Sequence, residues 1–502
     1  MTSFVRAAVR TGAALAMVSQ LCAQRGSGDW TTTGYDAQRS HWLRNDAKIS
    51  PAVMSKPGFE LLWKVKLKGT LTPPALLDFY IGHRGFRTLG FVGSSSDAVV
   101  AIDTDLSRIE WETKVGSGTA APGTPPCPGG MTSSVARITG LAYAPMGGGP
   151  GRATPAKGGV GEPGEGAVTL LNRPAQPNFP PPPSAGTTKG GRRTAAPPGP
   201  FSRGPQYVHA ISSDGKLHMM YLASGEEPNP ALPFLPANAN ARGVLVFDNV
   251  VYAATVNGCG GVEDGLWALD LESKKVAQWK STSGNVAGTD GFAAGPDGTL
   301  YVAAGNELVA LEPITLAPKG SYKTGGAVFT SSPIVFEFKG KNVIAASTGD
   351  GKIHLVNSSG MAPVEAFAAG LGNYVVGALA SWQDAGGSRW LLAPSAGKVT
   401  AWKVADKGGM PALEQGWASR DLVSPITPAI VNGVIFAVSA GRRGGASAVL
   451  YALDSGSGKE VWSSGKSITS VVTTGGLAAG GARVYVSSID GTQYAFGIPM
   501  EH

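Results

Sequence analysis

Short apolar strands separated by glycine-rich turns recur along this chain of 502 residues. The stretch "ALDSGSGKEVW", from Ala452 to Trp462, contains an apolar strand, a Gly/Ser turn and a tryptophan at its far end. Imperfect copies are "AIDTDLSRIEW" (Ala101–Trp111) and "ALDLESKKVAQW" (Ala268–Trp279). Alternation of apolar and polar positions with a period of two, broken by a turn, is typical of an antiparallel hairpin. The pattern therefore predicts a repeated β-hairpin.

Stretches equivalent to the strand before the tryptophan continue along the chain. They are "VVAIDTD" at Val99, "VHAISSD" at Val208, "LWALDLE" at Leu266, "LVALEPI" at Leu308, "IHLVNSS" at Ile353, "VTAWKVA" at Val399, "LYALDSG" at Leu450 and "TQYAFGI" at Thr492. A repeat of about 40–50 residues built from short strands indicates propeller blades. We predict an all-β, eight-bladed β-propeller in which each of these strands is the third of its blade. Seven blades are also compatible, because the second and sixth units are the least regular.

The two ends of the chain are predicted to close the ring. The eighth unit stops after its third strand, whereas residues 59–67 ("FELLWKVKL") precede the first unit and carry the tryptophan of an outer strand. An N-terminal strand that completes the last blade removes the exposed sheet edges. The predicted organisation is a signal peptide (1–23), a lead-in (24–58) and one propeller domain (59–502), which a disordered basic insertion rich in proline and glycine interrupts (147–204).

The first residues have the pattern of a secretory signal. Arg6 and Arg10 precede the apolar stretch "TGAALAMVSQLCA", and Ala23 is a small residue at the cleavage point. The flank "SQLC" lacks the small residue that normally precedes a lipidated cysteine, which argues against lipidation of Cys22. We expect a periplasmic or extracellular monomer with no transmembrane segment.

Export leaves Cys127 and Cys259 in an oxidising compartment, where a disulfide is the default for a lone pair. Two separate buried thiols are the alternative. By strand order, Cys127 lies in the connection between blades one and two, and Cys259 lies in a second-to-third-strand loop. Both positions emerge on the same face of a propeller, so the bond is geometrically reasonable.

The formal net charge of +7 is confined to two places. The signal segment and the stretch 147–204 carry the excess of basic residues, and the rest of the chain is neutral, which argues against a nucleic-acid partner. The candidate anion-binding residues are Arg192 and Arg193 in the insertion, and Arg442 and Arg443 in a second-to-third-strand loop. We place the insertion in the same type of loop, which predicts one basic face for an anionic polysaccharide, an envelope component or an acidic protein. The alternative is a solvated linker without a partner.

Two sets of residues recur at equivalent places in the blades. The tryptophans at the start of outer strands, predicted to dock each blade on the next, are Trp63, Trp111, Trp279 and Trp462. The hydroxyl residues where inner strands begin are Thr72, Thr132, Thr289, Thr330, Thr427 and Thr473. These threonines would satisfy backbone groups near the axis or, alternatively, line a polar funnel for a small ligand.

The repeat resembles a known family. "ALDSGSGKEVW" matches the Ala-x-Asp-x-x-x-Gly-Lys-x-x-Trp docking motif of the quinoprotein (PQQ-dependent) alcohol dehydrogenases, and "DWTTTGYDAQRSHWLRNDAKIS" followed by "ELLWKVKL" is similar to their lead-in. The resemblance covers nearly all of the mature chain at the level of repeats. Non-enzymatic PQQ-like propellers such as the assembly factor BamB share the motif, so the resemblance implies the fold more strongly than the activity.

The family's active site is implied much less clearly. In those enzymes PQQ lies on the axis beneath a ring of two adjacent cysteines, calcium is held by acidic and amide side chains, and an aspartate acts as base. This chain has no adjacent cysteine pair. Asn257 and Asp290 are the only candidates for a ligand and a base, and such residues are ordinary in propeller loops. We assign no catalytic residue, no metal ligand and no cofactor, with PQQ and calcium possible by resemblance alone.

The sequence therefore favours an exported PQQ-like propeller that acts as a binding or scaffold module. The first alternative is a PQQ-dependent alcohol or sugar dehydrogenase with a degenerate cofactor site. The second is a BamB-like scaffold for outer-membrane assembly, which would need an attachment to the envelope.

Overall fold

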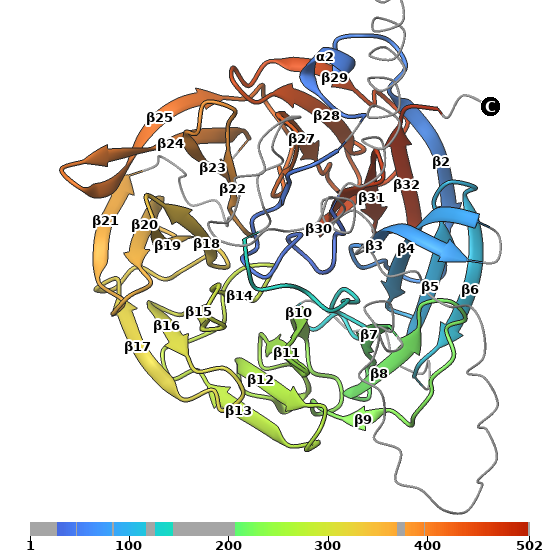
Figure 1. The fold of residues 1–502 in the computed structure, drawn as a ribbon, viewed down its shortest axis with the longest axis horizontal. Helices are drawn as coiled ribbons and strands as arrows, with labels where there is room; N and C mark the ends of the chain where they lie inside the picture. Colours follow the sequence, from blue (N-terminus) through green and yellow to red (C-terminus); the bar gives the residue numbers. More distant parts are fainter. Residues whose placement is uncertain are drawn as a thin grey trace, which may run out of the picture.

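The computed structural model describes residues 28–46, 48–82, 85–116, 126–143, 206–368, 377–395 and 397–499. The strands of these residues form eight sheets, which stand radially around one axis (Figure 1). The helical elements of the described residues are the short helix α2 (Pro51–Met54) and the 3-10 turn η2 (Cys259–Gly261). The predicted eight-bladed propeller is confirmed, and the seven-bladed alternative is wrong.

Most blades are four-stranded antiparallel meanders in chain order, with the first strand innermost. Blade 1 contains β3 (Ala75–Gly82), β4 (Gly85–Ser94), β5 (Ala98–Asp103) and β6 (Arg108–Lys114); blade 3 contains β10 (Ala241–Phe247), β11 (Val250–Thr255), β12 (Gly265–Asp270) and β13 (Val276–Lys280); blade 4 contains β14 (Phe292–Ala294), β15 (Leu300–Ala304), β16 (Glu307–Leu311) and β17 (Pro318–Lys323). Blade 5 contains β18 (Ile334–Phe338), β19 (Lys341–Ser347), β20 (Lys352–Asn357) and β21 (Pro363–Ala368); blade 6 contains β22 (Ala380–Gln383), β23 (Arg389–Pro394), β24 (Val399–Lys407) and β25 (Met410–Ala418). Blade 7 contains β26 (Ala429–Val431), β27 (Val434–Ser439), β28 (Val449–Asp454) and β29 (Glu460–Ser463), and β1 (Trp42–Leu43) adds a parallel strand beside β26.

Blade 8 is closed by the N-terminal strand, as predicted. β30 (Val472–Gly480), β31 (Arg483–Ser488) and β32 (Thr492–Gly497) form its first three strands. β2 (Glu60–Lys66) pairs antiparallel with β32, from Glu60 opposite Gly497 to Lys66 opposite Thr492. The first and last blades are therefore tied together, because the strand that completes blade 8 precedes blade 1 in the chain.

Blade 2 corrects one of the strand assignments. Its sheet contains β7 (Tyr207–Ile211), β8 (Lys216–Tyr221) and β9 (Leu232–Pro233), and its innermost position is a bridge at Ala136, which pairs antiparallel with His209 of β7. "VHAISSD" is thus the second strand of its blade and not the third. The prediction assigned this strand to the wrong position because the first strand of this blade is reduced to a short bridge.

This correction also changes where the insertion falls in the order of strands. In a meander, the second-to-third-strand loops and the connections between blades lie on one face, which we call the disulfide face. The first-to-second and third-to-fourth turns lie on the other, which we call the groove face. Stretch 147–204 falls between the first and second strands of blade 2 in chain order, and it lies outside the described residues. Arg442 and Arg443 lie in the β27–β28 loop on the disulfide face, which is a loop of another type, so one shared basic face stays a prediction.

The inner strands are buried on both sides, and the outer strands alternate. All six residues of β27 are buried, whereas β17 alternates between exposed and half-buried positions. This difference follows from packing, because an inner strand contacts both neighbouring blades and an outer strand borders solvent. The buried apolar clusters accordingly lie between adjacent blades.

The turn of the docking motif in blade 7 receives a tryptophan from the preceding blade. Trp417, at the end of β25, donates from Nε1 to the Ser455 carbonyl of blade 7 (2.9 Å). Gly458 lies in the same turn with a φ of +69°, and a Cβ atom at this position would come within 2.2 Å of the Trp417 ring. The motif requires glycine here because the backbone is left-handed and the ring of the preceding blade fills the space.

Candidate functional site

The centre of the propeller is occupied by its own N-terminal segment. We call residues 28–46 the axial segment; it winds through the middle of the ring (blue in Figure 1). The carbonyl oxygens of Trp30, Thr31, Ala37, Gln38, Ser40 and His41 accept hydrogen bonds from the backbone N–H groups of Leu76, Arg137, Ala294, Val335, Ser381 and Ile430, in blades 1, 2, 4, 5, 6 and 7 respectively. Thr32 Oγ1 donates to the Val244 carbonyl of blade 3. Asp46 Oδ2 accepts from the Ala482 N–H of blade 8 (3.0 Å). The segment therefore contacts all eight blades in their order around the ring.

Arg39 is the most extensively bonded residue of this segment. Its guanidinium donates to the carbonyls of Phe292 (2.9 Å), Thr33 (2.5 Å) and Gly243 (2.7 Å), and to Thr32 Oγ1 (2.9 Å). The side chain is fully buried, and this burial lowers its pKa to about 10. Arg39 therefore stays charged at neutral pH and fixes backbone groups at the axis.

Asp290, the candidate base, lies on the axis and is fully buried. Its Oδ2 lies 2.8 Å from His41 Nε2, and its Oδ1 accepts from the hydroxyls of Thr33 and Thr289, both at 3.3 Å. Burial alone would raise the pKa of Asp290, but His41 and Arg39 hold it below its ordinary value. Both carboxylate oxygens are thus bonded within the chain.

Asn257, the candidate ligand, lies in a different environment. It belongs to the β11–β12 loop, and its side-chain amide donates to the Pro126 carbonyl at 3.4 Å. The structure does not bring it into a site with Asp290, and no group of three His, Cys, Asp or Glu side chains in the described ranges could hold a metal ion. The residues present do not fit PQQ and calcium in the way the resemblance implies, because the carboxylate that would serve as base is buried and already bonded.

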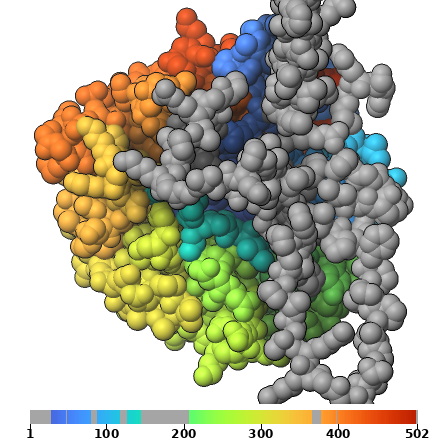
Figure 2. Space-filling view, viewed as in Figure 1, coloured from blue at the N-terminus to red at the C-terminus, as the bar shows by residue number. Residues whose placement is uncertain are grey.

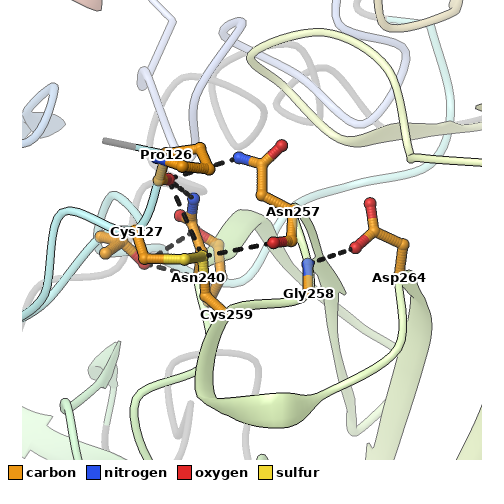
Figure 3. Close-up of a disulfide and its surroundings, with 9 residues drawn as sticks. Pro126, Cys127, Asn240, Asn257, Gly258, Cys259 and Asp264 are labelled. Carbon is orange, nitrogen blue, oxygen red and sulfur yellow. Dashed lines mark hydrogen bonds between the residues drawn. A yellow bond between two sulfur atoms is a disulfide. The ribbon is translucent and has the colours of Figure 1, made fainter. Parts of the chain in front are cut away.

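The predicted disulfide is present in the structure. Cys127 and Cys259 are joined, with their Cα atoms 5.5 Å apart (Figure 3). Asn240 also donates to the Pro126 carbonyl, at 3.3 Å. Asp264 accepts from the Gly258 N–H at 2.8 Å, which anchors the loop that carries Cys259. The bond therefore ties the connection after blade 1 to blade 3, on the disulfide face.

The hydroxyls predicted near the axis serve the backbone. Thr72, Thr132, Thr330, Thr427 and Thr473 donate to the carbonyls of Gly93, Ala241, Ser347, Ala378 and Ser487, at 2.9–3.3 Å. The sixth, Thr289, donates to Asp290. These contacts support the structural interpretation of the ring of threonines.

The predicted docking tryptophans lie between blades. Trp63 of β2 donates to the Thr104 carbonyl of blade 1, and Trp111 donates to the Leu222 carbonyl of blade 2, both at 2.9 Å. Trp279 packs against the apolar cluster shared by blades 3 and 4, and Trp462 packs against Phe59 and Phe496. Trp417 has the same position in blade 6, but the motif does not predict it, because its strand "MPALEQGWA" lacks the Asp-to-Gly spacing.

A Ser–His–Glu array was also missed. Ser212 Oγ lies 2.9 Å from His218 Nε2, and His218 Nδ1 lies 2.9 Å from Glu227 Oε1, as in a catalytic triad. However, Ser212 also donates to Asp214. The pattern "SSDGKLH" recurs as "TGDGKIH" in blade 5, where Thr348 and Tyr322 flank His354 in the same way. We interpret the array as a device that fixes the β7–β8 hairpin, and the repeated Asp-Gly-Lys-x-His spacing could have revealed it.

The groove face carries an open groove at its rim. It has a volume of about 410 Å³ and lies between the turns of blade 5 and the β24–β25 hairpin, which projects from the ring in Figure 1. Its apolar lining includes Phe338, Val343, Val364 and Met410, and Met410 is 58% exposed. Lys339 and Lys341 stand at its edge. No repeat pattern predicts this groove, because it depends on the extra length of one hairpin.

The remaining anion-binding candidates are not gathered into a site. Arg442 and Arg443 are exposed on the disulfide face. Arg192 and Arg193 lie outside the described residues. In the part of the chain that the structure describes, no helix is long and apolar enough to cross a membrane.

Neither a protein-family model nor a curated protein matches the chain. Among solved structures, a europium-containing methanol dehydrogenase aligns with a TM-score of 0.57 at 10% identity, covering 95% of this chain and 99% of that protein. The quinohemoprotein alcohol dehydrogenase from Comamonas testosteroni aligns with a TM-score of 0.54 at 15% identity, covering 96% and 84%. BamB from Moraxella catarrhalis aligns with a TM-score of 0.49 at 13% identity, covering 88% of this chain and 99% of that protein. The chain therefore has the eight-bladed PQQ-like propeller fold that its repeats predicted, and this similarity shows the fold alone.

Proposed function

We propose that this propeller is an exported binding module that holds a partner protein in the groove between blades 5 and 6. The observation that carries the proposal is the groove itself. It combines an apolar floor with an exposed methionine, and methionine side chains adapt well to varied partners. Concave apolar sites with a few polar groups are where proteins usually bind ligands.

The charges at the edge of the groove favour an acidic partner segment. Lys341 is exposed and projects from the same turn as Lys339, which is paired with Asp406. An apolar segment flanked by glutamate or aspartate would bury its apolar side chains against Phe338 and Met410 and place a carboxylate near Lys341. We therefore expect an extended peptide of mixed apolar and acidic character.

The axial contacts favour a binding module over a dehydrogenase. The carboxylate in the position of a base is engaged by His41 and two threonine hydroxyls. Titration with PQQ and calcium tests this alternative: we expect no saturable binding and no dye-linked alcohol oxidation. Saturable micromolar binding of PQQ would support the dehydrogenase instead.

Export is part of the proposal and is supported by the disulfide, because such bonds persist mainly outside the cytosol. The basic insertion would add an anionic partner. Deletion of residues 147–204 should then lower retention of the protein on an acidic glycan column. Unchanged retention would leave the insertion as a solvated linker.

The groove is tested by photocrosslinking in the source cells. A benzophenone amino acid replaces Met410 in one variant and Arg443, on the other face, in the control. We expect an adduct with one partner from position 410 only. The purified partner should bind Met410→Asp at least tenfold more weakly than the wild type and Arg443→Asp equally well. A partner that binds Met410→Asp with unchanged affinity would contradict the proposal.

A further inference from the structure

Arg44 and Arg389 meet over the ring of Trp42, near the axis and toward the groove face, and we call this place the mouth. Arg44 directly follows β1, the part of the axial segment that pairs with blade 7. Its guanidinium carbon lies 4.4 Å from the centre of the Trp42 ring. The guanidinium carbon of Arg389, at the start of β23, lies 5.6 Å from the same ring and 5.9 Å from the ring of Phe336. Two cations thus converge on one aromatic surface.

Arg389 makes no hydrogen bond or ion pair to any described residue, and its Nε atom is buried without a partner. A guanidinium has five N–H donors, and burying a cation without an acceptor is costly. Burial, together with the nearby charge of Arg44, lowers the pKa of Arg389 to about 10, so it remains protonated at neutral pH. This arginine therefore offers an unused set of donors at a half-buried position.

The surrounding charges do not neutralise it directly. Asp36, the acidic residue nearest to Arg44, accepts from the backbone N–H and the hydroxyl of Ser40 (2.8 and 2.7 Å) and only distantly from Arg44 (3.4 Å). The charge of Glu337 acts to raise the pKa of Arg389, but no ion pair joins these two described residues. The phenol of Tyr143 is already hydrogen-bonded to Asn342 (2.9 Å).

Residues 138–143 lead from blade 2 to this mouth. Ile138 bridges in parallel with Val246 of blade 3, and Tyr143 reaches Asn342 of blade 5. Figure 2 shows the teal part of the chain, which belongs to residues 126–143, at the surface beside the light-green blade 3. The mouth is thus framed by ordered backbone on this side.

We propose that Arg389, assisted by Arg44, binds a carboxylate group at this mouth. The planar fork of a guanidinium matches the two oxygens of a carboxylate, and the Trp42 and Phe336 rings hold the fork in place. The negative charges of Asp36 and Glu337 disfavour a phosphate dianion at the same position. The carboxylate belongs either to a free organic acid or to an acidic side chain of a bound peptide.

The test titrates the full-length protein at constant ionic strength and follows tryptophan fluorescence and thermal unfolding. The probes are benzoate, inorganic phosphate, and the peptide Ac-Ala-Glu-Ala-NH2 with Ac-Ala-Gln-Ala-NH2 as its control. We expect saturable binding of benzoate, of the glutamate peptide, or of both, and at least tenfold weaker binding of phosphate and of the glutamine peptide. The probe that binds identifies the source of the carboxylate.

Arg389→Gln should weaken the binding at least tenfold, and Arg389→Lys, which keeps the charge but not the fork, should weaken it less. Arg420→Gln is the matched control and should bind like the wild type, because Arg420 also lies over an aromatic ring, 4.7 Å from the centre of the Tyr451 ring, but is already paired with Glu460. Equal binding by Arg389→Lys and Arg389→Gln variants that melt like the wild type would overturn the proposal. So would the absence of saturable binding to every carboxylate probe, or a preference for phosphate. This site does not depend on the rim groove, so it can fail or succeed independently of the proposed function.

Discussion

His41 and Asp290 meet on the axis of the propeller, with Nε2 and Oδ2 2.8 Å apart, although 249 positions separate them in the sequence. The contact joins the axial segment to the start of blade 4. It uses the carboxylate that the family resemblance suggested as a catalytic base. Asp290 is therefore part of the framework that seats the axial segment.

Replacing Arg39 tests how much this framework stabilises the fold. Arg39→Ala removes donors to three carbonyls and leaves Asp290 with less positive charge near it. Breaking such a buried charged network costs about 3–5 kcal/mol. Urea unfolding should show this loss, and Arg443→Ala, on an exposed loop, should change the free energy of unfolding by less than about 0.5 kcal/mol. A loss below about 1 kcal/mol for Arg39→Ala would mean that the axial segment is not held as described.

The disulfide should contribute to stability because it closes a loop across two blades. The sequence separation of its cysteines is 132 residues, and removal of such a bond typically costs about 2–5 kcal/mol. We expect the Cys127→Ser, Cys259→Ser double variant to unfold at lower urea concentration than the wild type. Cys22→Ser is the control and should not change the midpoint. A thiol assay on the unfolded, unreduced chain should detect Cys22 alone if the signal segment is retained, and no thiol if it is removed.

The turn glycine of blade 7 should be intolerant of a side chain. Gly458→Ala forces a Cβ atom against the Trp417 ring in addition to the strain of a positive φ. We expect a loss of at least about 2 kcal/mol, since overpacking alone costs about 1–3 kcal/mol. Gly444 also has a positive φ, of +72°, but faces open space, so Gly444→Ala reports the backbone strain alone. Similar losses for the two variants would show that the tryptophan does not press on this turn.

Stability should fall in mild acid because of His209. This histidine of β7 is buried, its Nδ1 has no partner among the described residues, and burial lowers its pKa to about 4. Between pH 6.5 and 4 the unfolded chain binds a proton that the folded chain does not, so the free energy of unfolding decreases as the pH falls through this range. From pH 7.5 to pH 5 the loss from this residue is about 2 kcal/mol.

The variant His209→Leu removes this titrating group together with its hydrogen bond to the backbone of Ala136, so the two proteins are compared by how much each loses with pH. Its free energy of unfolding should change less than that of the wild type between the same two pH values. Urea unfolding at pH 7.5 and pH 5 measures both. Parallel losses in the two proteins would assign the acid sensitivity to other groups.

The repeat architecture could be predicted because each blade carries local signals. Apolar alternation and turn residues predict the hairpin before Trp462. Apolar alternation also predicts the strand at residues 59–67. The second blade could not be predicted in the same way, since its first strand is only the bridge at Ala136 and its second strand follows a long insertion. Counting by similarity therefore assigned β7 to the third position of its blade instead of the second.

The contents of the axis could not be predicted from local patterns. The stretch "TTTGYDAQRSHW" has no regular period, and its structure depends on hydrogen bonds to blades that follow as many as 436 positions later, such as that between Asp46 and Ala482. The rim groove and the position of Arg389 also arise only when blades 5 and 6 come together. Long-range partners of this kind leave no spacing in the sequence.

Hydrogen–deuterium exchange of the peptide that covers residues 28–46 tests the central claim most directly. The claim is that this N-terminal segment fills the axis and is bonded to all eight blades. Its amides that donate hydrogen bonds within the buried axis, such as those of Tyr35, Arg39 and His41, should then exchange as slowly as those of the buried strand β27 (Val434–Ser439), over hours at neutral pH. Exchange within seconds, as in an exposed loop, would contradict the account.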